Sequence, residues 1–400
     1  MDSLKNTNFK KNHSIKVIVP GGKSATQLGV VRGFGRRNIP VVYIDLEEQS
    51  IARHSKYIHK RLKCLGLMVS DDNFINLLLN LGEKSNNKMA IIPTGDLDAL
   101  AISKYKKELE QFYHIPIPEY NIAKNMVNKN NFYKLLEKLN VDYPNTLIPK
   151  NLDELEFLKS KMPFPYIIKP SNSILFQDEF AQKCFVLNSQ QEFRKAIEKL
   201  KNKNLDVMIQ EIIPGNDIYA ISMYFNKDSK PLAICGYDKL RHFPPDFGNG
   251  SFCKTAWRSV PIDIAVQLLT SIGYHGIAEP EFKKDPRDGK YKLLEINVRT
   301  SLQNRLPAGS GHDIEYIAYL DVTRQNIGDL SLPDSGIEWV HDPYDFLSCL
   351  RQIKDSRLEI KDMLKSFKGK KIHSVVAIDD PIPLFIHMIG MFRRKLKTII

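Results

Sequence analysis

The stretch from Gly273 to Arg299, GYHGIAEPEFKKDPRDGKYKLLEINVR, decides the fold and the chemistry that we expect of this chain. It holds two short apolar–acidic runs, residues 277–282 and residues 291–297, separated by a turn rich in Asp, Pro, Arg and Gly. Short runs of this kind joined by such a turn are typical of a hairpin-like pair of strands.

Three oxygen-bearing side chains lie in these two runs. Alternation along a strand places Glu295 and Asn297 on one face, and pairing of the strands can bring Glu281 beside them. Two carboxylates and an amide oxygen form a hard oxygen site that suits Mg²⁺ and bound phosphates. On spacing alone, the favoured interpretation is a pair of exposed acids on an amphipathic hairpin.

The whole stretch, however, resembles the metal-binding signature of the ATP-grasp ligases, through Glu-Phe-Lys-Lys-Asp in the first run and Leu-Leu-Glu-Ile-Asn-Val-Arg in the second. The resemblance implies that Glu281, Glu295 and Asn297 hold the magnesium ions that bridge the ATP phosphates. It also implies that Arg299 helps to hold the transferred phosphate or the acyl phosphate.

Length and cysteine content give general bounds. A chain of 400 residues exceeds one ordinary core, so two or three domains are expected. The five cysteines are scattered and show no CxxC spacing, which argues against a disulfide framework and a zinc site and fits a reducing cytoplasm. The polar N-terminus has no apolar run of the signal-peptide type.

The formal net charge of +12 comes from an excess of lysine. Compositional drift explains this excess better than a dedicated groove for a polyanion, because no face interleaves basic and aromatic residues as nucleic-acid binding would require. A positive field still favours phosphorylated or carboxylated substrates.

The N-terminal part reads as a Rossmann-like domain. Residues 14–45 have a strand–turn–helix–strand pattern, with the helix from Ser24 to Arg37 capped by Ser24. A P-loop at Gly22-Lys23-Ser24 is excluded because the motif needs glycine where Val17 stands. A later strand ends in Thr94-Gly95-Asp96, where we expect Asp96 to cap a helix rather than to contact substrate.

Three lysines are candidates for phosphate contacts. Lys129 opens a helix at the place where ATP-grasp enzymes have a phosphate-binding lysine, although Asn128 and Asn140 depart from the common Asp and Gly. Lys169 ends the apolar strand Tyr-Ile-Ile-Lys-Pro and matches the family's second ATP lysine. Lys183 follows a glycine-poor loop like that of D-aspartate ligase-type members, and an exposed strand-end lysine is an equal alternative.

The segment from Val207 to Asp217 resembles the hinge that reads adenine in this family. The resemblance places Gln210, Glu211 and Ile213 beside the adenine, and Asp217 at the ribose hydroxyls. Without the other motifs, Ile-Pro-Gly-Asn-Asp is only a turn signal.

Two further cations, Lys239 and Arg241, end a strand and precede the Pro/Gly-punctuated loop 243–251. Such a layout suits a substrate-facing loop in which Lys239 or Arg241 holds a carboxylate or the γ-phosphate. A plain surface loop is the alternative. Arg305 is a modest candidate for an acidic substrate.

The C-terminal tail, residues 383–397, is apolar and then cationic. Its apolar run is too short to span a bilayer. Two interpretations stay open: a helix that docks on the body of the protein, and a segment that lies in a membrane interface.

Together these features predict an α/β and α+β chain with a Rossmann-like domain, a two-lobed ATP-grasp domain and a C-terminal extension. The expected divisions are residues 1–123 for the Rossmann-like domain, 124–206 for the small lobe with its linker helix, 207–328 for the large lobe with the metal site, and 329–400 for the extension with its basic amphipathic tail.

The resemblance implies an ATP-dependent carboxylate–amine ligase that works through an acyl phosphate and releases ADP, with ATP and Mg²⁺ or Mn²⁺ as cofactors. The expected partners are a small carboxylate, such as an amino acid, and an amine acceptor, without nucleic acid; a homodimer is open. The alternatives are transfer of the acyl phosphate to a thiol or a carboxylase-type acceptor, and a non-catalytic nucleotide-binding protein.

Overall fold

The structure, a computed structural model, describes residues 15–65, 71–171, 176, 179–180, 182–201, 203 and 205–397. Most of the glycine-poor loop between Lys169 and Lys183, and the first 14 residues, lie outside the described residues. The expected mixed α/β and α+β class is confirmed, because one parallel sheet and two mainly antiparallel sheets share the chain.

The N-terminal sheet is parallel, with the strand order β3-β2-β1-β4-β5. Its strands are β1 (Val17–Pro20), β2 (Val41–Asp45), β3 (Ile58–Lys63), β4 (Met89–Ile91) and β5 (Tyr113–His114). The helical elements of this part are α1 (Thr26–Gly35), the 3₁₀ turn η1 (Ala52–His54), α2 (Asp72–Glu83), α3 (Asp96–Lys104), α4 (Lys106–Leu109) and α5 (Tyr120–Val127). Every residue of β1 and β2 is buried, as a parallel sheet covered on both faces requires.

Two expected helix caps are wrong. Helix α1 begins at Thr26 and its N-cap is Ala25, while Ser24 lies one residue earlier and accepts a hydrogen bond from Thr26 N (3.2 Å). Helix α3 is capped by Gly95 and not by Asp96. The side chain of Asp98 performs the capping, because it accepts hydrogen bonds from the backbone N–H groups of Thr94 (2.9 Å) and Gly95 (2.7 Å).

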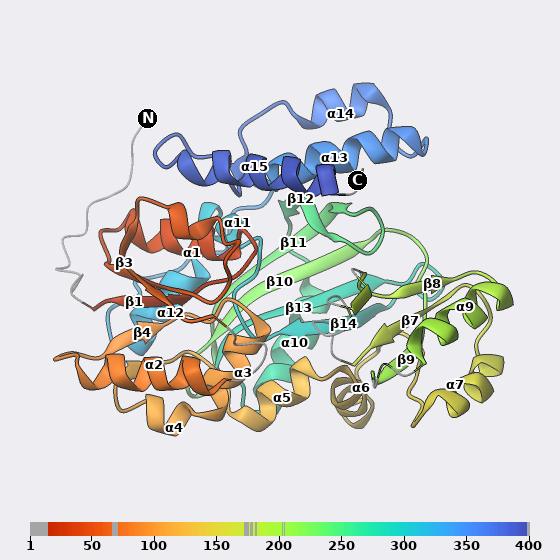
Figure 1. The fold of residues 1–400 in the computed structure, drawn as a ribbon, viewed down its shortest axis with the longest axis horizontal. Coiled ribbons are helices and arrows are strands. Elements are labelled where there is room, and N and C mark those ends of the chain that lie inside the picture. The colour runs from red at the N-terminus through yellow and green to blue at the C-terminus, as the bar shows by residue number, and fades with distance from the viewer. Residues whose placement is uncertain are drawn as a thin grey trace.

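A four-stranded sheet with the order β6-β9-β7-β8 lies to the right in Figure 1. Its strands are β6 (Thr146–Leu147), β7 (Tyr166–Pro170), β8 (Phe185–Leu187) and β9 (Val207–Glu211). The helical elements here are α6 (Lys129–Lys138), α7 (Leu152–Leu158), η2 (Lys159–Lys161) and α9 (Gln190–Leu200). Its apolar residues pack into a separate core with α7 and α9.

The large sheet has the order β14-β13-β10-β11-β12-β15-β16 and is antiparallel except where β16 joins β15. Its strands are β10 (Ile218–Phe225), β11 (Pro231–Phe243), β12 (Asn249–Thr255), β13 (Gly276–Lys284), β14 (Tyr291–Asn297), β15 (Glu338–Val340) and β16 (Ile372–His373). Helices α10 (Ser259–Ser271), α11 (Arg305–Gly309) and α12 (Ile314–Val322) belong to the same part of the chain. The loop expected at 243–251 is therefore shorter, since β11 runs to Phe243 and β12 starts at Asn249.

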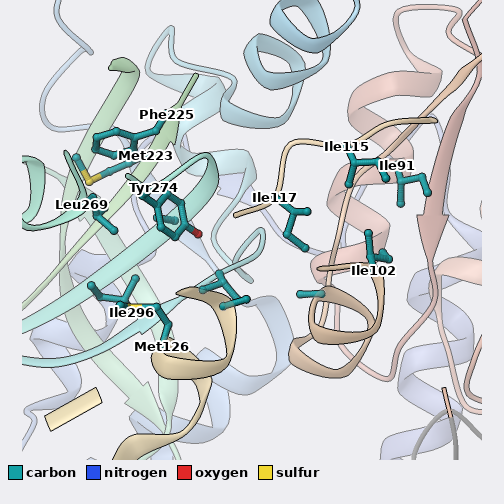
Figure 2. Close-up of a cluster of buried hydrophobic side chains, with 14 of the residues drawn as sticks. Ile91, Ile102, Ile115, Ile117, Met126, Met223, Phe225, Leu269, Tyr274 and Ile296 are labelled. Carbon is teal, nitrogen blue, oxygen red and sulfur yellow. The ribbon is translucent and has the colours of Figure 1, made fainter. Parts of the chain in front are cut away.

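One hydrophobic cluster joins the parallel sheet to the large sheet. It contains Ile91 and Ile117 from the N-terminal part, Met223 and Ile296 from the large sheet, and Tyr274 from the turn between α10 and β13. Figure 2 shows these side chains as one band that passes between the two parts. This shared core holds the carboxyl edge of the parallel sheet against the strands that carry the acidic residues.

The C-terminal extension forms a helical layer at the top of the view in Figure 1. It consists of α13 (Asp342–Lys354), α14 (Ile360–Ser366) and α15 (Ile382–Lys397). Helix α15 docks on the body, because Leu384 and Ile386 pack against the core of the N-terminal part and His387 is buried. Among the described residues, no helix has the length and apolar character needed to cross a bilayer.

Candidate active site

The pairing of β13 with β14 sets the geometry of the acidic residues. The expected hairpin-like pair is antiparallel, with Glu281 opposite Glu295 and Glu279 opposite Asn297. Residues that face each other across an antiparallel pair have Cβ atoms about 4.5–5.5 Å apart on one face of the sheet. The strands therefore bring together the three side chains for which a metal role was expected and add a fourth, Glu279.

Lys239 reaches this group from β11. Its Nζ forms a very short ion pair with Glu281 Oε2 and lies 4.0 Å from Glu279 Oε1. Burial of Lys239 opposes its charge, but the two glutamates outweigh that effect and raise its pKa. Glu279 Oε2 also accepts a hydrogen bond from the Tyr237 hydroxyl (2.9 Å).

Lys129 approaches the same group from the start of α6. Asn128 caps that helix by accepting a hydrogen bond from Asn131 N (3.1 Å), which fixes Lys129 in the first turn. Lys129 Nζ then lies 3.3 Å from Glu295 Oε2. Lys129 is the main reason that the pKa of Glu295 falls to about 2, with Lys183, Lys169 and Lys239 adding to the effect against burial.

Lys169 comes from the end of β7 and lies beside α6, because Lys129 N donates a hydrogen bond to Ser171 O (3.3 Å). Its Nζ donates a hydrogen bond to the Tyr133 hydroxyl (2.6 Å). Burial lowers the pKa of Lys169 well below its ordinary value, and the nearby charge of Lys129 lowers it further. A buried ammonium group in this state gains most from an added anion.

Lys183 lies just before β8 and donates a hydrogen bond to Asn249 Oδ1 (2.7 Å). The Lys183 side chain is exposed, as the alternative interpretation expected; partial desolvation lowers its pKa, and the charges of Glu295 and Glu281 oppose that effect. Lys183 therefore lies within electrostatic range of the same acids as the other lysines, although the acids belong to the large lobe and Lys183 to the small one.

The combined residues fit a phosphate chain with a divalent cation. Lys129 and Lys239 form ion pairs with Glu295 and Glu281, and Lys169 and Lys183 also help to lower the pKa of Glu295, so the site favours additional negative charge. No group of three or more His, Cys, Asp or Glu side chains among the described residues is arranged to hold a metal alone. Proteins bind Mg²⁺ through one or two carboxylates together with substrate phosphates, so Glu281, Glu295 and Asn297 would hold it only together with a bound nucleotide.

The expected adenine hinge is only partly open to a ligand. Strand β9 lies between β6 and β7, so the backbone groups of Gln210 and Glu211 face neighbouring strands. The Gln210 side chain donates a hydrogen bond to Thr146 Oγ1 (2.6 Å), and Glu211 pairs with Arg287 (2.7 Å). Backbone recognition of a base would therefore begin after Glu211, near Ile213, which is buried.

The residue expected at the ribose, Asp217, is 42% exposed and forms an ion pair with Arg258 (2.6 Å). It follows the turn after β9 and lies at the start of β10. Its carboxylate remains accessible from solvent, so the ribose role stays a prediction.

Arg299 follows β14, the strand that carries the candidate metal ligands Glu295 and Asn297. Its Nη2 donates a hydrogen bond to Asn297 Oδ1 (3.1 Å), and its Nε forms an ion pair with Asp96 Oδ1 (3.1 Å). The guanidinium therefore connects the candidate metal ligand Asn297 to the carboxyl edge of the parallel sheet.

Arg241 lies outside this cluster. A register shift in β11 between Lys239 and Arg241 separates the two cations. The guanidinium of Arg241 forms two hydrogen bonds to the buried carboxylate of Asp345 in α13 (2.9 and 2.6 Å). Arg305 is likewise paired with Asp313 (3.2 Å). Both arginines thus form ion pairs that stabilise the fold. The hydrogen bonds and ion pairs that they form in the described part of the chain do not include the four lysines or the glutamates of the candidate site.

Sequence reasoning missed Glu279 and Tyr133, and it expected Asp96 to cap a helix rather than to contact substrate. Strand alternation carries a signal for Glu279, because it lies two residues before Glu281 on the same face. No local pattern marks Tyr133, which holds Lys169, and none shows that Asp96 pairs with Arg299, 203 residues further along the chain.

Comparisons with known proteins agree with these features. No protein-family model matches the chain. A D-aspartate ligase from Enterococcus faecium (strain Aus0004) is 27% identical over 316 residues, which cover 75% of this chain and 73% of that protein.

Several solved structures share the fold at low sequence identity. A carboxyaminoimidazole ribonucleotide synthase from Aspergillus clavatus, complexed with ATP, has a TM-score of 0.61 at 15% identity, with 80% of each chain covered. An L-amino acid ligase from Bacillus licheniformis has a TM-score of 0.60 at 14% identity, covering 79% of this chain and 77% of that one. The biotin carboxylase domain of a Hydrogenobacter thermophilus 2-oxoglutarate carboxylase, with MgADP, has a TM-score of 0.62 at 14% identity, covering 81% and 73%. The chain thus has the ATP-grasp fold of the carboxylate–amine ligases and is similar in sequence to a D-aspartate ligase.

Proposed function

We propose that the protein is an ATP-dependent ligase that joins a carboxylate to an amine through an acyl phosphate. The observation that carries this proposal is that Glu281 and Glu295 face each other across two paired strands, beside four lysines that come from both lobes. The positive charge of these lysines matches the negative charge of a triphosphate with its divalent cation, and these charged side chains do not pack an apolar core.

The reaction needs no protein nucleophile. A carboxylate oxygen attacks the γ-phosphorus, the bond from phosphorus to the β-phosphate oxygen breaks, and ADP leaves with the electron pair. The amine nitrogen then attacks the acyl carbon, the carbon–oxygen bond to phosphate breaks, and the proton lost from nitrogen leaves with the phosphate. The products are an amide, ADP and phosphate.

We assign the side chains by their contacts. Lys129, Lys169 and Lys183 would hold the phosphates, while Glu281, Glu295 and Asn297 would hold Mg²⁺ or Mn²⁺. When bound, that cation neutralises charge on the phosphates.

Arg299 and Lys239 would stabilise negative charge on the reacting groups. Residues near Ile213 would contact the adenine, with the side chains of Gln210 and Glu211 behind it, and Asp217 would contact the ribose. For Arg241, a catalytic role has no contact in its support, and we propose instead that it fixes α13 to the large sheet through Asp345.

Sequence similarity to the E. faecium protein narrows the choice of carboxylate substrate. Because the E. faecium protein is a D-aspartate ligase, D-aspartate is the first carboxylate to test, and other amino acids follow.

We further propose the domain division 1–123, 124–206, 207–328 and 329–400, in which the extension also completes the large sheet through β15 and β16. Five free cysteines, three of them buried, suit a reducing compartment such as the cytoplasm. A homodimer is a further proposal, because the related biotin carboxylase domain is described as a dimer.

The test of the proposed function is the substitution Glu295→Gln. Carboxylate-dependent release of ADP, measured with D-aspartate and hydroxylamine as a trap for the acyl phosphate, should fall by more than about a hundredfold, the loss typical of removing one electrostatic catalytic group. The matched control is Glu338→Gln, which removes a charge from β15 of the same sheet where Glu338 pairs with Lys254 and Lys371. Turnover that survives Glu295→Gln, or that is lost equally in the control, contradicts the metal assignment.

A further inference from the structure

The loop Thr94–Gly95–Asp96, at the carboxyl end of β4, is rigidly supported. The Thr94 hydroxyl donates a hydrogen bond to Pro20 O (2.7 Å) and accepts one from Gln27 Nε2 (3.1 Å). The buried carboxylate of Asp98 accepts hydrogen bonds from the two backbone N–H groups that precede Asp96. These contacts fix the backbone at Asp96, so its side chain is presented from a defined position.

The same loop is hydrogen-bonded to the segment that directly follows β14. Thr300 N donates a hydrogen bond to Pro93 O (3.2 Å), one residue after Arg299 and one residue before Thr94. The ion pair between Asp96 Oδ1 and Arg299 Nε lies next to this bond. Parallel α/β sheets place ligands at the carboxyl ends of their strands, and here that edge meets the residue expected to hold the acyl phosphate.

The ion pair with Arg299 leaves one carboxylate oxygen of Asp96 available to a ligand. The Asp96 side chain is 31% exposed, and its second oxygen, Oδ2, has no hydrogen-bond partner within the described part of the chain. The carboxylate thus offers one oxygen to Arg299 and one to the solvent side of the junction between the parallel sheet and the large sheet.

We propose that Asp96 forms the binding subsite for the acceptor amine and holds its ammonium group through Oδ2. The bound ammonium group then loses one proton to water, and the neutral amine attacks the acyl phosphate held by Arg299. This inference rests on the ligase function proposed above and deepens it, because it assigns the class of acceptor: an amine that arrives as a cation. A carboxylate is the natural partner of an ammonium group, and its charge offsets the repulsion between that group and the guanidinium of Arg299.

A purely structural ion pair between the two parts of the chain is the competing explanation, and the choice of nucleophile separates the two. Hydroxylamine is uncharged near neutral pH and captures the acyl phosphate without an ammonium subsite, whereas ammonium and methylamine are cations that need one. The experiment compares Asp96→Asn with the wild-type enzyme in both arms, using D-aspartate and ATP, and scores hydroxamate, amide and ADP.

The proposal requires that Asp96→Asn raise the ammonium and methylamine concentrations for half-maximal amide formation by about 10–100-fold, the loss expected for one charge-assisted hydrogen bond. Hydroxamate formation and the KM for ATP should stay within about twofold of wild type, because binding energy is lost only for the charged acceptor. The control Asp71→Asn removes a carboxylate at the start of α2 that pairs with Lys104 at the end of α3 (3.0 Å) and should change neither arm.

Equal losses in the two arms would show a structural role and overturn the subsite. So would a wild-type enzyme that forms hydroxamate but gives no amide with either cation. A wild-type enzyme without D-aspartate- or other carboxylate-dependent ADP release in any arm would instead contradict the ligase function itself.

Discussion

At the scale of single residues, Lys169 is the group whose protonation should report on nucleotide binding. Burial lowers its pKa well below the ordinary value in the free protein, and Lys129 adds to that effect. A bound triphosphate stabilises the ammonium form, so the pKa of Lys169 is higher in the complex than in the free protein. Between these two pKa values the complex binds more protons, and the affinity for ATP should fall as pH rises through that window.

This proton uptake can be measured by titration calorimetry of ATP binding in buffers of different ionisation enthalpy. We expect net uptake with the wild-type protein at pH values between the Lys169 pKa of the free protein and that of the complex, and a smaller uptake with Lys169→Met. Lys254→Met, which removes a half-exposed lysine from β12, is the control and should leave the uptake unchanged. The same uptake in Lys169→Met as in the wild type would show that Lys169 does not meet the phosphates.

Individual site residues also show how far the sequence alone could predict the site. Glu281, Glu295 and Asn297 were predictable because strand alternation and one short turn determine which side chains meet. Arg241 was assigned toward substrate because it stands near Lys239, but a shift in register separates them and Arg241 binds Asp345, which is 104 residues away. A partner at that distance follows from tertiary packing, and no local spacing encodes it.

At the scale of elements, the junction of α1 with the segment before α15 is held by a buried ion pair. Arg32 and Asp380 are 3% and 1% exposed and lie 3.0 Å apart. Asp380 also accepts hydrogen bonds from Ser55 Oγ (2.6 Å) and Lys56 N (3.0 Å). Asp380→Ala leaves the guanidinium of Arg32 buried without its partner, so it should lower the free energy of unfolding by about 3–5 kcal/mol.

The neighbouring residue supplies the control for this prediction. Asp379 pairs with Arg36 (2.8 Å), but both side chains are 42% exposed, and exposed pairs contribute at most about 1 kcal/mol. In urea unfolding followed by circular dichroism, Asp380→Ala should therefore shift the midpoint several times more than Asp379→Ala. Equal shifts would mean that burial does not distinguish the two acids.

Elements with a clear period were predicted well, and their ends less well. The buried runs of β1, β2 and β7 were recognised from pattern, because burial imposes a pattern of its own on the sequence. The ends depended on hydrogen bonds that hydrophobic periodicity does not reveal: Asp98 caps α3 from inside the helix, and β12 extends into the expected loop by pairing with the end of β11. The role of the segment Asp379–Asp380 likewise required α1, which precedes it by more than 340 residues.

At the scale of the whole molecule, charge and apolar surface are concentrated in the C-terminal layer. Residues 346–397 contain twelve lysines and arginines and five acids. Of the twenty large apolar side chains that are exposed in the described part of the chain, eleven lie after residue 345. On α15, one face docks on the body while Ile382, Phe385 and Ile389 are 53%, 63% and 48% exposed.

This distribution reconciles the two interpretations of the tail, since the helix is docked and still presents an apolar outer face. Exposed apolar area bordered by cations is the pattern that binds an anionic lipid surface, where burial and charge act together. We therefore predict peripheral binding of the layer formed by α13, α14 and α15 to anionic membranes. In Figure 1 this layer lies along one side of the molecule, so binding would leave both lobes of the active site facing the solvent.

The measurement is co-sedimentation with phosphatidylcholine vesicles that either contain or lack phosphatidylglycerol. The wild-type protein should sediment only with the anionic vesicles and less at high salt, because screening weakens the contribution of the lysines and arginines. The double substitution Phe385→Ser and Ile389→Ser should remove most of the sedimentation, while Phe157→Ser, on the exposed face of α7 in the small lobe (66% exposed), should not. A wild-type protein that stays in the supernatant with both kinds of vesicle would show that this face does not bind lipid. So would a dimer in solution that the double substitution separates into monomers, because a second copy of the chain would then cover the face.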